Sequence, residues 1–391
     1  MTKYENKPYF TRSLKAPNQS FFLFGPRGTG KSTWLKSSFK APLYINLHSS
    51  KDYLDLVKNP ALLRDLIQAA DKKWVAIDEI QKLPLLLDEI QEIMGDDSFK
   101  VQFILTGSSA RKLKKKNSNL LAGRARLRNF FPLTSEELGY DFNVDELLKY
   151  GCLPTIHQLS KHQDKVDYLF SYAQTYLNEE IRQEAVVRQL EPFIRFLDVS
   201  SLLNGQIWNC SEIARDVGVA RTTVEGYLSI LLDTLIAEKV EGFRPQAKVK
   251  EKSNPKYYYF DSGVVRALSG NLNESLSAYE KGYLLETWIL HELRAFSSYK
   301  MKMAQFSYWD IPQKAEVDFI VKVGARRFGI EIKYSKEWKT SFNDGLNVLL
   351  EKKHIQQGFG VYQGERELKQ GAVRIFPLKI FLRKLWNEEL F

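Results

Sequence analysis

Residues 25–32, GPRGTGKS, have the composition and spacing of a loop that binds phosphate. Glycines let the backbone curl until its N–H groups face an anion, and a helix that begins beside the loop points its positive end at the same anion. Lys31 would then reach the β- and γ-phosphates, and the Ser32 hydroxyl would bind Mg²⁺. The alternative is a glycine-rich turn with a chance lysine and serine. The motif predicts a nucleotide site formed by Gly25, Pro26, Arg27, Gly28, Thr29, Gly30, Lys31, Ser32 and Thr33.

Two acids end a later apolar stretch, WVAIDEI (74–80), which is typical of a buried parallel strand. Asp78 would bind in the magnesium shell, and Glu79 would act as the general base for the attacking water. A third strand, VQFIL (101–105), leads to Thr106 and Ser108. Either hydroxyl could hydrogen-bond the terminal phosphate or the water, although a polar turn explains them equally well.

Basic residues follow the third strand. Arg124 and Arg126 lie between a helical stretch and another apolar strand, where either could reach a phosphate. An arginine there can neutralise transition-state charge on the ATP of a neighbouring subunit. The run 111–116, RKLKKK, is a candidate nucleic-acid contact, but such runs are more often solvated faces.

A second group of chemistry-bearing residues lies in the last third. Glu286 is in the amphipathic helix 281–293, Asp318 is in the strand AEVDFIV, and Glu331 and Lys333 share one face of the strand FGIEIKYS. The stretch VKVGARR suits a tight connection between two antiparallel strands. Asp318 and Glu331 are hard oxygen ligands for Mg²⁺ or Mn²⁺, and Glu286 would complete that shell. Lys333 would activate water or stabilise a pentavalent phosphate; the alternative is an edge-strand charge pair.

The sequence pattern also predicts the strands and helices that position these residues. A strand over 21–24 (FFLF) precedes the glycine loop, and a helix (TWLKSSF) follows it. Residues 143–205 are helix-rich, with an apolar spacing near that of an α-helix and a break at 151–154 (GCLP). Residues 209–243 predict a helix-turn-helix, with Ser211 as the first N-cap and a second helix over 220–235. The strands after it flank a wing with Lys248, Lys250 and Lys252, so DNA contact and a purely connecting role both remain open.

Composition sets outer limits on function. The 391 residues are 44% hydrophobic and 13% aromatic, which excludes global disorder and supports several domains. The net charge of +10 is compatible with a polyanionic partner. Cys152 and Cys210 lack metal-ligand spacing, so the sequence argues against a zinc finger or disulfide scaffold and favours a reducing cytoplasm. No apolar run reaches about 18 residues and the charged N-terminus lacks the apolar core of a secretory signal, so we expect no membrane association.

Four segments in this order, GPRGTGKS, WVAIDEIQ, FILTGSSA and LAGRARLRNFFPLTSEEL, resemble the AAA-type (AAA+) ATPases of a bacterial and archaeal group. In that group a winged helix and a nuclease-like domain follow the ATPase. The resemblance covers nearly the whole chain. It implies that Thr106 or Ser108 is the sensor and that Arg124 is the arginine finger. One departure is that no clear second sensor arginine follows residue 150.

The helix Glu286, strand Asp318 and Glu331-x-Lys333 resemble the PD-(D/E)XK nuclease superfamily. The proline of that motif is absent, because Val317 precedes Asp318. The resemblance implies a restriction-endonuclease-like α/β fold with Glu286, Asp318, Glu331 and Lys333 as its active site.

The sequence therefore predicts three α/β modules: an AAA+ ATPase with a helical lid (1–205), a winged helix (206–268) and a nuclease-like domain (270–391). The expected function is ATP hydrolysis coupled to DNA engagement and metal-dependent phosphodiester cleavage, with Glu79, Arg124 and the four C-terminal residues as catalytic groups. Expected cofactors are ATP and Mg²⁺, with Mn²⁺ at the second site, and expected partners are DNA and further copies of the chain. The alternative is a nucleotide-switched regulator whose nuclease-like domain only recognises a partner.

Overall fold

The computed structural model describes residues 10–108, 120–177, 190–244 and 254–391. The basic run 111–116 and the wing lysines Lys248, Lys250 and Lys252 lie outside these ranges. The chain forms two compact units. The P-loop unit comprises Arg12–Pro132 and Asp233–Ile236, and the C-terminal unit comprises Leu133–Leu232 and Ala237–Phe391 with the N-terminal residues. The three-module division stays a prediction.

The P-loop unit is built on a parallel sheet of five described strands in the order β2-β3-β4-β1-β5. The strands are β1 (Phe21–Phe24), β2 (Leu43–Asn46), β3 (Trp74–Asp78), β4 (Gln102–Gly107) and β5 (Arg126–Asn129). β1 is buried on both faces, as expected for a central parallel strand. The carboxyl ends of β1, β3 and β4 therefore meet at one edge of the sheet.

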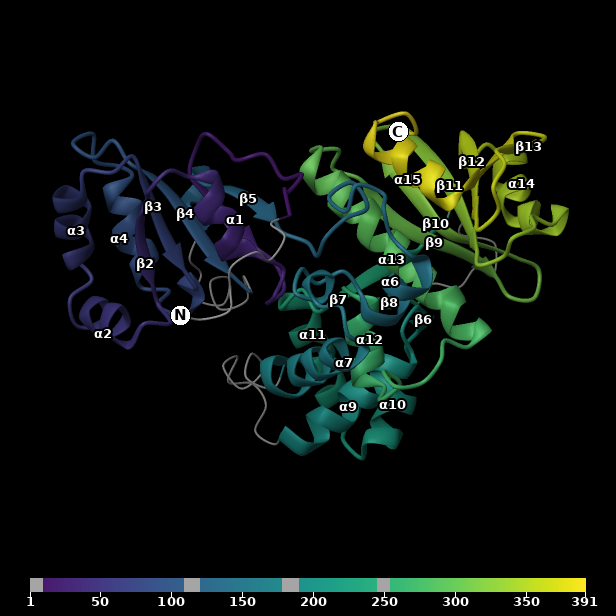
Figure 1. Cartoon of the computed structure of the whole chain (residues 1–391), viewed down its shortest axis with the longest axis horizontal. Coiled ribbons are helices and arrows are strands. Elements are labelled where there is room, and N and C mark those ends of the chain that lie inside the picture. Colours follow the sequence, from purple (N-terminus) through teal and green to yellow (C-terminus); the bar gives the residue numbers. More distant parts are fainter. Residues whose placement is uncertain (1–9, 109–119, 178–189, 245–253) are drawn as a thin grey trace. The chain divides into compact units, whose positions relative to one another are not determined.

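Helices cover both faces of this sheet (Figure 1). They are α1 (Lys31–Ser38), α2 (Ser50–Lys58), α3 (Leu62–Ala70) and α4 (Leu86–Ile93), with 3₁₀ turns at Ile80–Lys82 and Leu120–Gly123. Apolar residues of α2, α3 and α4 pack in one core with Phe22 and Phe24. On the other face, Trp34 of α1 packs against Phe21 and Phe130. The alternation of Phe21 and Phe22 between the two cores gives a three-layer α/β/α arrangement.

The helical part of the C-terminal unit matches the predicted helix-rich segment. Its elements are α6 (Val144–Tyr150), a 3₁₀ turn (Ile156–Gln158), α7 (His162–Ser171), a π-helical turn (Tyr172–Leu177), α9 (Leu190–Leu202), α10 (Cys210–Val217), α11 (Arg221–Asp233) and α12 (Ser262–Leu268). The sequence prediction of the α10 start was wrong, because the Asn209 side chain caps it and accepts the Ser211 N–H. Asparagine caps a helix as well as serine does, so the pattern alone does not choose between them.

A mixed sheet forms the rest of the C-terminal unit, in the order β13-β14-β12-β11-β10-β9-β7-β8-β6 among the described strands. Its strands are β6 (Gln206–Ile207), β7 (Ala237–Gly242), β8 (Lys256–Tyr259), β9 (Gln305–Ile311), β10 (Ala315–Val323), β11 (Arg326–Lys333), β12 (Gln357–Tyr362), β13 (Leu368–Gln370) and β14 (Val373–Pro377). β10 and β11 are antiparallel neighbours, as predicted. The β7–β8 hairpin of the predicted winged helix joins this sheet, because β7 pairs in parallel with β9.

Three helices pack on this sheet: α13 (Ala278–Tyr299), α14 (Asp344–Glu351), which follows a 3₁₀ turn (Thr340–Asn343), and α15 (Leu378–Trp386). α13 extends beyond the predicted helix at both ends, and it begins earlier because Ser277 as N-cap and Glu280 in the first turn form a capping box. Leu346 and Leu349 of α14 pack with Val317 and Ile320 of β10. Within the described ranges, every helix is too short or too polar to traverse a bilayer.

Candidate functional site

The backbone of the glycine loop has a conformation that favours glycine. Gly28 and Gly30 have φ of +78° and +94°, which residues with a side chain rarely adopt. A Cβ at Gly25 would lie 2.1 Å from the Phe130 carbonyl oxygen, so only glycine fits there. The buried Lys31 Nζ donates to the carbonyl oxygens of Gly25 (2.7 Å) and Pro26 (3.0 Å). The loop therefore curls around its own lysine, at the start of α1.

Asp78 at the end of β3 accepts hydrogen bonds from three hydroxyl groups. Ser32 Oγ lies 3.0 Å from Asp78 Oδ2, and the hydroxyls of Tyr44 and Thr106 donate to the same carboxylate. Burial and the contact with Asp78 raise the pKa of Tyr44. The structure thus brings together the two predicted magnesium ligands of this unit, Ser32 and Asp78, and their oxygen atoms suit Mg²⁺. Tyr44 was missed by sequence reasoning, because a tyrosine in a short strand carries no motif signal.

Glu79 follows directly, with a left-handed φ of +62°. Its carboxylate accepts a hydrogen bond from the Gln81 side-chain amide, and His48 Nε2 lies 3.7 Å from Glu79 Oε1. The predicted strand over 74–80 was too long, since this backbone turn ends β3 at Asp78. Burial raises the pKa of the Glu79 carboxyl, but His48, Lys31 and Gln81 together lower it below its ordinary value. Glu79 is therefore kept ionised, as a general base must be.

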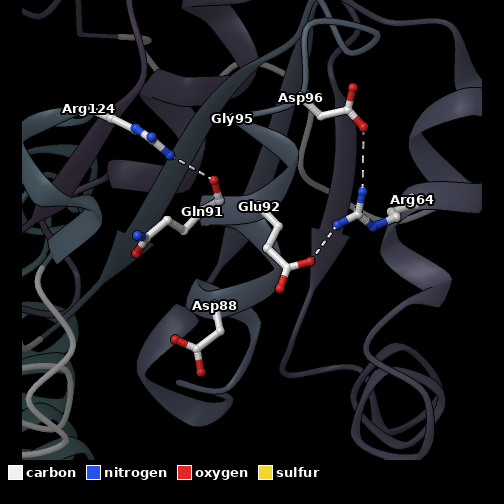
Figure 2. Close-up of a pocket in the computed structure, with 7 residues that line it drawn as sticks. All are labelled: Arg64, Asp88, Gln91, Glu92, Gly95, Asp96 and Arg124. Atoms are coloured by element: carbon white, nitrogen blue, oxygen red, sulfur yellow. Dashed lines mark hydrogen bonds and ion pairs between the residues drawn. The ribbon is translucent and has the colours of Figure 1, made fainter.

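Arg124 lies at a different place in the same unit. Figure 2 shows it beside α4, where its Nη1 donates to the Gln91 carbonyl oxygen at 2.9 Å. It lines a pocket of about 580 Å³ together with Arg64, Asp88, Gln91, Glu92, Gly95 and Asp96. Arg64 forms ion pairs with Glu92 and Asp96 there. Neither the glycine loop nor Asp78 lines this pocket, so the structure of one chain does not bring Arg124 to the nucleotide residues.

In the C-terminal unit, Asp318 and Glu331 lie on adjacent strands, and each is only 3% exposed. Asp318 Oδ2 accepts the Ile332 N–H at 2.7 Å. Glu331 Oε1 lies 2.5 Å from Lys333 Nζ, whereas Glu331 Oε2 has no hydrogen-bond partner among the described residues. A buried carboxylate oxygen without a donor is costly unless something else binds it.

A third carboxylate completes the group. Glu316, Asp318 and Glu331 can each present an oxygen so that all three oxygens lie within 4.8 Å of one another. Such a set of hard oxygen donors suits Mg²⁺ or Mn²⁺. Glu316 is exposed, and the sequence reasoning missed it. Its position two residues before Asp318 on one strand was the available signal.

Glu286 lies beside this group and outside the set of three. Its carboxylate accepts a hydrogen bond from the buried Tyr258 hydroxyl at 3.1 Å. Burial and the negative charge of Asp318 raise the pKa of Glu286 to about 7. Burial and Asp318 also raise the pKa of Glu331. This acidic crowding is what a divalent cation would relieve.

Two lysines face the carboxylates. Burial lowers the pKa of Lys333, but Asp318 and Glu331 outweigh burial and raise it. The same holds for Lys256 of β8, whose pKa is raised by Glu286 and Asp318. Lys256 was assigned only to a wing strand by sequence reasoning, because its place beside the acids depends on how β8 joins the sheet.

The helix-turn-helix region gives little support for phosphate contact. Arg221, at the start of α11, forms an ion pair with Glu225 at 2.9 Å. On α10, the exposed Arg215 is accompanied by the exposed acids Glu212 and Asp216. These two helices carry two arginines against four acids, Glu212, Asp216, Glu225 and Asp233, whereas a DNA-binding surface needs an excess of positive charge.

Three family models match successive parts of the chain. Residues 17–139 match an AAA domain, residues 141–275 match a domain of unknown function (DUF8612), and residues 281–381 match another domain of unknown function (DUF4143). The winged helix and the nuclease-like fold stay predictions, since neither of the last two matches names them.

The relatives found are themselves uncharacterised proteins. One from Mycobacterium bovis and one from Mycobacterium tuberculosis are each 27% identical over 262 residues, covering 66% of this chain and 58% of theirs. One from Haemophilus influenzae is 27% identical over 252 residues, covering 58% of this chain and 61% of its own. The chain thus spans less than two thirds of the length of these relatives.

A crystal structure of a Vibrio cholerae protein is similar at 10% identity, covering 95% of this chain and 97% of that one, with a TM-score of 0.21. The parallel sheet with its glycine loop fits a P-loop domain. Together with the family match, it supports an AAA-type P-loop ATPase domain at residues 17–139, which suggests ATP binding and hydrolysis.

Proposed function

We propose that this protein hydrolyses ATP in its P-loop unit and cleaves phosphodiester bonds of DNA at the carboxylate group of its C-terminal unit. The observation that carries the second activity is the set of Glu316, Asp318 and Glu331, whose oxygens lie within 4.8 Å of one another, beside Lys333. The first activity is supported by the AAA match and by the glycine loop that curls around Lys31.

In the P-loop unit, the loop N–H groups and Lys31 would bind the β- and γ-phosphates. Mg²⁺ held by Ser32 and Asp78 would neutralise phosphate charge. Glu79 would take a proton from a water whose oxygen attacks the γ-phosphorus, while the bond to the bridging oxygen of ADP breaks and phosphate is released. Thr106 fixes the Asp78 carboxylate through its hydrogen bond.

In the C-terminal unit, Asp318, Glu331 and Glu316 would hold Mg²⁺ or Mn²⁺, which would polarise the scissile phosphate. Lys333 lies on the same strand face as Glu331 and would stabilise the additional negative charge that develops on the phosphate. A water molecule would attack phosphorus and lose a proton to solvent, while the bond between phosphorus and the sugar oxygen breaks and that oxygen takes a proton from solvent. Glu286, with its pKa raised to about 7, would accept or release a proton near neutral pH.

Two variants separate the activities. Glu79→Gln should bind ATP but turn it over at least about 100-fold more slowly, because it lacks the base. Asp318→Asn should lose Mn²⁺-dependent nicking of plasmid DNA and keep its ATPase rate. A wild-type chain that is folded and binds neither ATP nor Mn²⁺ would contradict both parts of the proposal.

A second candidate is a nucleotide-switched regulator whose C-terminal unit only recognises a partner. The observation that favours it is the ion pair between Glu331 and Lys333, which can stabilise a fold without any metal. ATP hydrolysis together with intact plasmid, at Mn²⁺ concentrations that saturate the wild-type protein, would favour this alternative.

A further inference from the structure

Gln81 connects two predicted parts of the ATPase site. It lies in the 3₁₀ turn Ile80–Lys82, which follows Glu79, and is only 5% exposed. Its side-chain amide donates both to Glu79 Oε2 and to Ser108 Oγ, the latter at 3.1 Å. One amide group therefore joins the candidate general base to the hydroxyl that follows β4.

The local backbone is shaped to allow this contact. The left-handed φ of +62° at Glu79 turns the chain at once, so that Gln81 returns toward β4. Gly107, at the end of β4, makes room for it, because a Cβ at that position would lie 2.3 Å from Gln81 Oε1. A side chain on residue 107 would push the amide away from its present place.

Core packing does not explain this glutamine. Gln81 Oε1 is buried and has no hydrogen-bond partner among the described residues. A buried polar atom without a partner costs free energy, so an apolar residue would serve packing better. The amide nitrogen, by contrast, donates hydrogen bonds to Glu79 and Ser108, so these two contacts are what a glutamine provides at this position.

We propose that Gln81 is a positioning residue for ATP hydrolysis, which orients the Glu79 carboxylate and links it to Ser108. The inference rests on the proposed role of Glu79 as general base. An amide that donates to one carboxylate oxygen restricts rotation of the carboxylate and leaves the other oxygen to accept a proton. Its effect should appear in turnover and not in nucleotide binding.

The test compares Gln81→Met with wild type in steady-state ATPase assays and in titrations with a fluorescent ADP analogue. We expect kcat to fall by about 10-fold to 100-fold, as for loss of a hydrogen bond to a charged group. KM and ADP affinity should stay within about twofold.

Two further variants make the outcome decisive. Gly107→Ala should reproduce the loss in kcat without changing residue 81, since its Cβ displaces the amide. Gln91→Met is the matched control and should behave as wild type, because the Gln91 side chain is exposed and the bond to Arg124 uses the Gln91 backbone carbonyl, which the substitution retains. A folded Gln81→Met protein with wild-type kcat, or with KM and ADP affinity weakened as much as kcat, would overturn the proposal. If the wild type itself lacks ATPase activity, it is the proposed function that fails.

Discussion

Substitution of Gly151 by alanine should destabilise the C-terminal unit strongly. Gly151 ends α6 with φ +77° and ψ −167°, a conformation that is essentially limited to glycine. An added Cβ would lie 1.9 Å from Oδ1 of the buried Asp261. That carboxylate caps α12 by accepting the Val264 N–H at 3.1 Å, and it also accepts the Cys152 N–H at 2.6 Å. The new methyl group would displace Asp261 from both donors.

The magnitude follows from two costs. Backbone strain at such a position is worth about 1–3 kcal/mol, and disturbing hydrogen bonds to a buried carboxylate costs a similar amount. We therefore expect Gly151→Ala to lower the free energy of unfolding by about 3–5 kcal/mol. At an m-value of about 2–3 kcal/mol per M, the urea midpoint would fall by about 1–2.5 M.

The assay is urea unfolding followed by far-UV circular dichroism, with Gly226→Ala as the matched control. Gly226 lies inside α11, and its added Cβ would meet nothing within 4 Å. Alanine there should stabilise the helix by about 0.5–1 kcal/mol. If both variants shift the midpoint in the same direction, the reasoning about the contact between Gly151 and Asp261 is refuted.

Three further predictions concern nucleotide, assembly and pH. Lys31→Ala should abolish ATP turnover in a folded protein, and normal turnover would remove the proposed nucleotide site. Mass photometry with ATP should show oligomers that Arg124→Ala weakens; particles of only 45 kDa in the wild type would contradict a role for Arg124 in trans. Burial raises the pKa of Glu292 to about 7 and that of Asp261 to about 6. Folding therefore favours their protonated forms, so thermal melts should show stability falling as pH rises from about 4 to 7, and Glu292→Gln should flatten that dependence.

Much of the P-loop unit could be predicted because its signals are local. The strand over 21–24 has the predicted bounds, and the strand that begins at Trp74 carries Asp78 at its end, although it stops two residues before its predicted bound. Gln81 could not be predicted as a contact of Glu79, since the contact depends on the left-handed turn at Glu79 and on the space at Gly107.

In the C-terminal unit too, features with local sequence signals could be predicted, and contacts that depend on the fold could not. The antiparallel neighbours β10 and β11 were predicted from the short VKVGARR connection, and they place Asp318 beside Glu331. Glu316, two residues before Asp318 on β10, was overlooked because the family resemblance assigns only Asp318 on that strand. The position of Lys256 depends on pairing between β7 and β9, which are distant in sequence, and no local signal encodes such a pairing.

The most direct test of the central claim is anomalous scattering from crystals of the full chain soaked in Mn²⁺ alone. We expect a peak between Glu316, Asp318 and Glu331 in the wild type, and loss of that peak in Asp318→Asn. Wild-type crystals with no peak among these three carboxylates, at a Mn²⁺ concentration that saturates other sites, would contradict it.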